Sequence, residues 1–151
     1  MAMQAHAGIR SVMLGGLVAG TLDIGAAALI NRVSPIVILR AVAGGLLGPA
    51  TFHMGAFSAT LGLLLQWLMS LLIAAIYVVA SRRLPALARH WVRGGLAYGA
   101  VIFVVMNFVV FPLSAYRHLP RHDPLHVAGD VLAMFVFGVI VAFFVRPAGN
   151  R

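Results

Sequence analysis

The sequence predicts an all-α membrane protein with four transmembrane helices, and three observations support this prediction. Of its 151 residues, 62% are hydrophobic, and the mean hydropathy is +1.03. Charged residues make up only 9%, where a soluble domain carries roughly 25%. Four apolar runs reach the length of about 20 residues that a helix needs to cross a bilayer. Because backbone hydrogen bonds in lipid must close within each segment, we expect these runs to be helices of one transmembrane domain, residues 1–151.

The four expected spans are each bounded by arginine, proline or both. They cover residues 11–30, 57–80, 94–113 and 125–145. The first run lacks the short apolar core and small-residue cleavage site of a removable signal peptide. We therefore expect it to stay in the protein as a membrane anchor.

A shorter segment, "SPIVILRAVAGGLLG" (34–48), separates the first two spans. It opens with Ser34 at a capping position and Pro35 at the first helical position, which is typical of a helix start. It is too short to span a bilayer, and Arg40 lies in its middle. We expect a short interfacial or re-entrant helix, with a plain amphipathic connector as the simpler alternative.

The arginines predict the orientation of the chain. All eleven basic residues are arginine; seven fall on the side of the two termini and four on the other side. The positive-inside rule then places both termini in the cytoplasm. The cluster "SRRLPALARHWVR" (81–93) carries most of this bias, and its Trp91 suits an interfacial anchor. Because the arginines lie between apolar runs, the net charge of +8 does not indicate a nucleic-acid partner.

The chain has the pattern of an internal duplication. "GGLVAG" (15–20) aligns with "GGLAYG" (94–99), and "FHMGAFSATL" (52–61) aligns with "LHVAGDVLAM" (125–134). The alignment makes His53 equivalent to His126. Each half would be a two-helix hairpin, and the halves would be parallel repeats about the membrane normal. The alternative is chance, because Gly, Ala and Leu are common throughout the chain.

Two GxxxG spacings, Gly16 with Gly20 and Gly95 with Gly99, lie in the first and third spans. This spacing lets helix backbones approach closely. We expect it to serve packing within the bundle rather than a dimer interface.

From residue 68 to about 145, the order of features resembles the YagU-like family of bacterial inner-membrane proteins. The matching features are "YVVASRRLP" (77–85), Trp91, the glycine-rich start at 94–99, Met106, "FPL" (111–113), and a last helix with a polar residue after Gly129. The resemblance implies a bacterial inner-membrane location and a four-helix body, and it implies no particular reaction. Where such a relative would have His, this chain has Asp130, so the resemblance transfers no ligand role.

Polar residues gather in the outer half of the expected bundle. At 1.5 Å per residue, Asp130 and Asn107 each lie about 9 Å from the outer boundary, and Asp23 lies about 12 Å from it. His126 precedes Asp130 by four residues and shares its face. The candidate ligand or proton site consists of Asp23, His53, Gln66, Asn107, His126 and Asp130.

A carboxylate that faces lipid costs at least about 2.5 kcal/mol, so Asp23 and Asp130 are expected to face the interior. One interpretation is a polar pocket, open to the periplasm, that exchanges protons or holds a small solute. The other is an interhelical hydrogen-bond lock, with each bond worth about 0.6–2 kcal/mol. The sequence leaves both open.

The sequence contains no recognisable metal-binding or catalytic motif. His53, His126 and Asp130, with Asp23 as an optional fourth ligand, form a donor set suited to Zn, Ni or Mn, and the two histidines could hold a haem, but no tight ligand motif such as HExxH is present. The chain has no Glu and no Cys, and it lacks a nucleophile elbow and a phosphate-binding loop. We therefore predict no cofactor, no metal and no enzymatic activity. His118 and His122 are expected to be solvated loop residues.

Two classes of function remain. The first is a small membrane protein that transports protons or a small solute through the polar residues. The second is a non-catalytic accessory or structural subunit of a larger membrane complex or of a homo-oligomer. The lipid bilayer is the expected surrounding in both.

Overall fold

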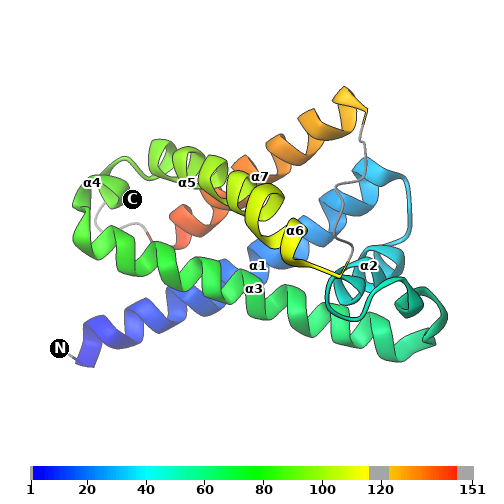
Figure 1. Ribbon diagram of the computed structural model, residues 1–151. Coiled ribbons are helices and arrows are strands. Elements are labelled where there is room, and N and C mark those ends of the chain that lie inside the picture. The colour runs from blue at the N-terminus through cyan, green and yellow to red at the C-terminus, as the bar shows by residue number, and fades with distance from the viewer. Residues whose placement is uncertain (1, 116–122, 146–151) are drawn as a thin grey trace.

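The computed structural model describes residues 2–115 and 123–145, with side chains from Gly8 onward. All regular structure in these ranges is helical, which confirms the predicted fold class (Figure 1). Four helical stretches are long and apolar enough to cross a membrane: Gly8–Asn31, Gly55–Arg83, Trp91–Leu113 and Pro124–Val145. The second stretch extends beyond the expected residues 57–80 at both ends.

The first half of the chain contains α1 (Ala2–Asn31), α2 (Pro35–Leu47), the 3₁₀ turn η1 (Pro49–His53) and α3 (Gly55–Arg83). The short helix predicted between the first two spans is α2. It begins at Pro35 after an extended Ser34, and it ends before Gly48, whose φ of 79° requires a residue without a side chain. A second positive-φ glycine, Gly55, begins α3.

The second half contains α4 (Pro85–Arg89), α5 (Trp91–Val105), the π-helical turn η2 (Met106–Val110), α6 (Phe111–Leu113) and α7 (Pro124–Val145). Pro112 has no backbone N–H and disrupts the regular hydrogen-bond ladder, which accounts for an irregular turn just before it. The sequence did not predict η2.

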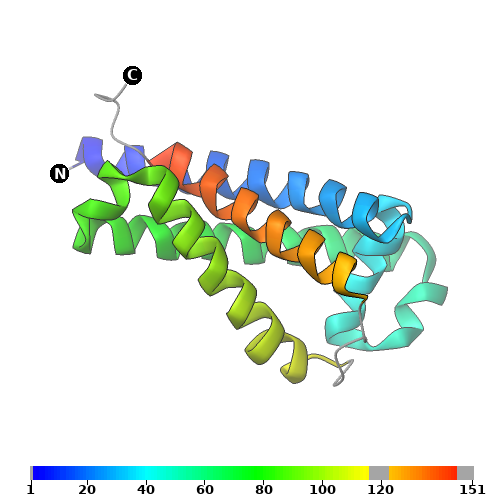
Figure 2. The ribbon, with the colours of Figure 1, turned by 90° about the horizontal axis from the view of Figure 1, so that it is seen from above.

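The long helices alternate in direction. The start of α1, the end of α3, the start of α5 and the end of α7 lie at one end of the bundle, and α2 lies at the other (Figures 1 and 2). α7 packs on both α1 and α5, and α3 packs on α1 and α2. The buried core lies where α1, α3, α5 and α7 meet and includes Ala19, Ala74, Tyr77, Ile102, Phe137 and Val141.

The first GxxxG pair brings α1 against α3. A Cβ at Gly16 would lie 3.0 Å from Leu71 Cα, and one at Gly20 would collide with Ser70 Oγ. The two helices approach closely here because both positions lack a side chain. Gly16 and Gly20 therefore act within the bundle, as predicted.

The second GxxxG pair brings α5 against α7. A Cβ at Gly95 would lie 2.7 Å from Val139 Cα, and one at Gly99 would lie 2.8 Å from Phe135 Cα. Gly138 of α7 meets the backbone of Gly95 and Gly99 in return. This pair, too, serves packing within the bundle.

The two hairpins differ in detail from the aligned repeat. His53 ends η1 before α3 begins, whereas His126 lies in the first turn of α7, so the two histidines have different local structures. The helix contacts also differ. The first GxxxG pair contacts α3 at Ser70, which the alignment pairs with Phe143 of α7. The second GxxxG pair contacts α7 about one turn before Phe143, near Val139.

Candidate intramembrane carboxylate site

Asp23 of α1 is the centre of the site. Its carboxyl group accepts a hydrogen bond from Gln66 of α3, with 2.9 Å between Gln66 Nε2 and Asp23 Oδ2. Gln66 is buried and belongs to a stripe of buried residues four apart along α3: Ser58, Gly62, Gln66, Ser70 and Ala74. These small and polar residues fall on one helix face, which turns the Gln66 amide toward α1.

A second cross-helix hydrogen bond lies next to the first. Trp67 Nε1 donates to Thr21 Oγ1 over 3.2 Å. Both pairs join α1 to α3 at nearly the same level of the bundle, so they hold Asp23 in a fixed position relative to α3.

Asp130 of α7 supplies the second carboxyl group. It is partly buried and lies close enough to Asp23 for its charge to act on that carboxyl group. It also lies one helical turn before Met134, which lines the interior beside Asp23. Two acids from opposite ends of the sequence thus share one neighbourhood.

A small interior cavity of about 30 Å³ adjoins Asp23. This volume exceeds the minimum that one water molecule needs. The walls combine Asp23, Gln66 and the Ser70 hydroxyl with thioethers and apolar side chains from α3, α5, η2 and α7: Met69, Ile73, Ile102, Met106, Met134 and Phe137.

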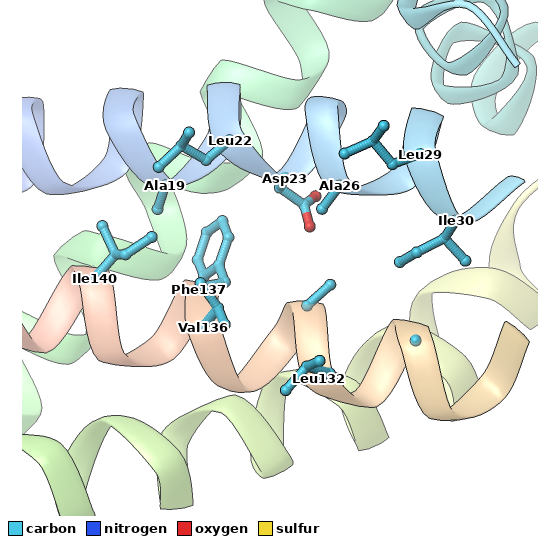
Figure 3. A pocket seen from close by; sticks show the side chains of 12 residues that line it. Ala19, Leu22, Asp23, Ala26, Leu29, Ile30, Leu132, Val136, Phe137 and Ile140 are labelled. Carbon is cyan, nitrogen blue, oxygen red and sulfur yellow. The ribbon is translucent and has the colours of Figure 1, made fainter. Parts of the chain in front are cut away.

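On its other side, Asp23 lines a groove of about 270 Å³ between α1 and α7. Figure 3 shows the Asp23 carboxyl group pointing from α1 toward α7, with Ala26 and Phe137 beside it. The side chain therefore lies between the interior cavity and a larger space at the helix seam. The sequence did not predict this groove.

The structure brings only part of the predicted site together. Asp23, Gln66 and Asp130 share one neighbourhood. Asn107 donates to the backbone carbonyl of Phe103 in its own helix over 2.9 Å, and it lines neither of the two spaces at Asp23. His53 is exposed in η1.

His126 lies in the first turn of α7, one turn before Asp130. Its Nδ1 is 4.0 Å from Asp123 Oδ2, three residues earlier. Within residues 2–115 and 123–145, no three His, Asp or Glu side chains gather as a metal site would require. The predicted loop residues His118 and His122 lie outside the described residues.

Sequence reasoning missed the methionines around Asp23 and the contribution of Ser70. Ser70 Oγ donates to the Gln66 carbonyl over 2.8 Å and fills the space left by Gly20. The four-residue spacing of Ser58, Gly62, Gln66 and Ser70 was the available signal, because it marks one polar, small-residue face on an otherwise apolar helix.

Comparisons with protein-family models, curated proteins and solved structures give no match. The resemblance to the YagU-like family therefore stays a prediction.

The arrangement has a clear electrostatic character. In the described part of the chain, the polar groups that act on the Asp23 carboxyl are an uncharged amide and a second carboxyl group. A carboxylate in a medium of low polarity is costly unless an opposite charge or a proton accompanies it. The Asp23 carboxyl group therefore favours a proton or a cation beside it and disfavours an anion.

Proposed function

We propose that the protein is a small transport protein that moves protons or a small solute across the membrane by way of Asp23 and Asp130. The observation that carries the proposal is the position of Asp23. Its carboxyl group lies between the interior cavity and the α1–α7 groove. It accepts a hydrogen bond from Gln66, and Asp130 acts on it electrostatically. Ionisable residues within spans commonly belong to proton or ion pathways.

The proposed location is a bacterial inner membrane with both termini in the cytoplasm. The end of the bundle that holds the start of α1 and the end of α7 also holds Arg10, Arg82, Arg83, Arg89 and Arg93. Of the described arginines, the opposite end has Arg32 and Arg40. The positive-inside rule favours the arginine-rich end as the cytoplasmic one.

Proton flux into liposomes tests the proposal. The purified protein is reconstituted around a pH-sensitive dye, and a potassium diffusion potential drives protons inward. The wild type is expected to acidify the lumen faster than empty liposomes. Asp23→Asn and Asp130→Asn are expected to reduce the rate to that of empty liposomes, because the amide cannot exchange a proton.

Asp123→Asn is the matched control, since it makes the same chemical change at an exposed acid outside the site. It should conduct like the wild type. A wild-type rate equal to that of empty liposomes would contradict proton conduction. Equal loss in Asp123→Asn would show that the effect is not specific to the Asp23–Asp130 neighbourhood.

A structural role is the second candidate, and the course of the third span favours it. Toward α6 this span diverges from α7 (Figure 2), and Phe108 and Leu113 are exposed. A partner helix could cover this face in a larger complex. In that case, the Asp130→Asn variant would leave assembly, measured as the molar mass of the detergent-solubilised complex, unchanged, and neither aspartate variant would alter flux.

A further inference from the structure

We propose that the α1–α7 groove is a binding site for a hydrophobic organic monocation, an amine or quaternary ammonium with an apolar body, held against Asp23. As a statement about cargo it rests on the proposed function, but the binding itself is separately testable. The proposal stands on the composition of the groove, its opening, its size and its charge.

The composition of the groove is apolar except at one point. Of the twelve residues that line it, Asp23 alone carries a charge. The other eleven are Ala, Gly, Leu, Ile, Val and Phe. A ligand must therefore place apolar surface against almost the whole wall and one cationic group at Asp23.

The groove opens to the side of the bundle. Four of its leucine and valine residues are half or more exposed: Leu22 at 55%, Leu29 at 81%, Leu132 at 64% and Val136 at 50%. All four lie within transmembrane spans, where the surrounding medium is lipid. A hydrophobic cation that partitions into the bilayer can reach Asp23 from this side without crossing the bundle core.

Small residues create the hollow. The α1 side of the groove includes Ala19 and Ala26, and the α7 side includes Gly129 and Ala133. A Cβ at Gly129 would already lie 3.2 Å from the Ile30 side chain. The space therefore depends on short side chains at specific positions of two helices.

The size selects a small ligand. A volume of about 270 Å³ is at the lower end of small-molecule pockets, so it suits one ring or a short chain beside an ammonium group. A small inorganic cation would need several oxygen ligands to replace its water, and the groove wall offers one carboxyl group.

The charge selects a cation. Gln66 donates one hydrogen bond to the Asp23 carboxyl group, and Asp23 is the one charged residue among those that line the groove. A quaternary ammonium has no N–H groups that require hydrogen bonds, so it loses less on leaving water than a primary ammonium does, and it gains the attraction of the Asp23 carboxylate. A lipid acyl chain would fill the same walls but would make no use of the charge.

The test is equilibrium binding of radiolabelled benzyltrimethylammonium to the detergent-purified protein. The wild type should bind it, and neopentylbenzene, which has carbon in place of the nitrogen, should not displace it. Asp23→Asn should weaken binding by at least about 10-fold, because the ammonium loses the Coulomb attraction of the carboxylate in a medium of low polarity. Ala133→Leu should abolish binding by filling the groove.

Two matched controls accompany these variants. Asp123→Asn repeats the charge change at an exposed acid, and Ala100→Leu repeats the size change at an exposed position of α5. Both should bind like the wild type. Circular dichroism and monodisperse elution verify the fold of each variant; if Asp23→Asn fails to fold, Ala133→Leu decides.

No wild-type binding, full binding by folded Asp23→Asn or Ala133→Leu, or displacement by neopentylbenzene would each overturn the proposal. Proton flux without cation binding would leave the proposed function standing and refute this inference. Cation binding without flux of either protons or the cation would support this inference and refute the proposed function.

Discussion

The Gln66 side-chain amide donates a hydrogen bond to the Asp23 carboxyl group across the α1–α3 interface, with 2.9 Å between Nε2 and Oδ2. The two residues are 43 positions apart in the chain. This pair ties the position of the acid to the packing of two helices. It serves stability and the proposed site at once, and the two contributions can be measured separately.

A double-mutant cycle measures the stability contribution of this bond. Asp23→Leu, Gln66→Leu and the double variant are unfolded in mixed micelles, and their free energies of unfolding are compared. We expect a coupling energy of about 0.6 kcal/mol, and at most about 1.7 kcal/mol, as is typical of hydrogen bonds within membranes. A coupling of zero would mean that the bond does not hold α1 against α3.

Close packing at Gly99 predicts a large effect of one methyl group. In Gly99→Ala the new Cβ would lie 2.8 Å from Phe135 Cα, so α5 and α7 must separate. We expect a loss of about 1–3 kcal/mol in the free energy of unfolding, as for overpacked cores.

Gly25→Ala is the control for that substitution, because a Cβ at Gly25 meets nothing within 4 Å. It should be neutral or stabilising by up to about 1 kcal/mol, since Ala favours a helix over Gly. Equal destabilisation by both variants would refute the assignment of Gly99 to a helix contact.

The contact of α2 with α3 predicts that Gly62 fixes the short helix in place. A Cβ at Gly62 would collide with the backbone carbonyl of Leu39, which cannot move without shifting α2. We expect Gly62→Val to release α2 while the four spans stay helical. Limited proteolysis should then cut within residues 35–47 in the variant and leave the wild type intact; resistance in both would contradict this contact.

The predicted orientation is testable because the chain has no cysteine of its own. Asp123→Cys lies at the end opposite the arginine-rich cluster, and Arg89→Cys lies within that cluster. In intact cells, a membrane-impermeant maleimide should label the first variant only, and lysis should make the second reactive. The opposite pattern would invert the topology, and labelling of both in intact cells would exclude the four-span arrangement.

Several features of this protein follow from the sequence alone. The number of spans and their approximate bounds depend on hydropathy and length, which the thickness of the bilayer fixes. Ser34 and Pro35 predict the start of α2, and the two GxxxG pairs predict close helix contacts. Each of these features is local, so a window of about 20 residues contains the whole signal.

The membership of the site was decided by tertiary structure. Asn107 has the depth expected of a site residue, but it follows Met106 into the π-helical turn and bonds to Phe103 of its own helix. His53 belongs to a 3₁₀ turn that ends before α3, so it lies outside the site. The depth of a residue in the membrane follows from its position along the helix. The direction of its side chain also depends on the local backbone conformation, such as the π-helical or 3₁₀ turn that contains it.

The α1–α7 groove is the feature least accessible to the sequence. Its lining combines Ala26 of α1 with Gly129 and Ala133 of α7, more than 100 positions away in the chain. Small residues are abundant everywhere in this apolar sequence, and most of them allow helices to touch. Which small residues leave a space beside a carboxyl group depends on how the two packed helices rotate and cross relative to each other.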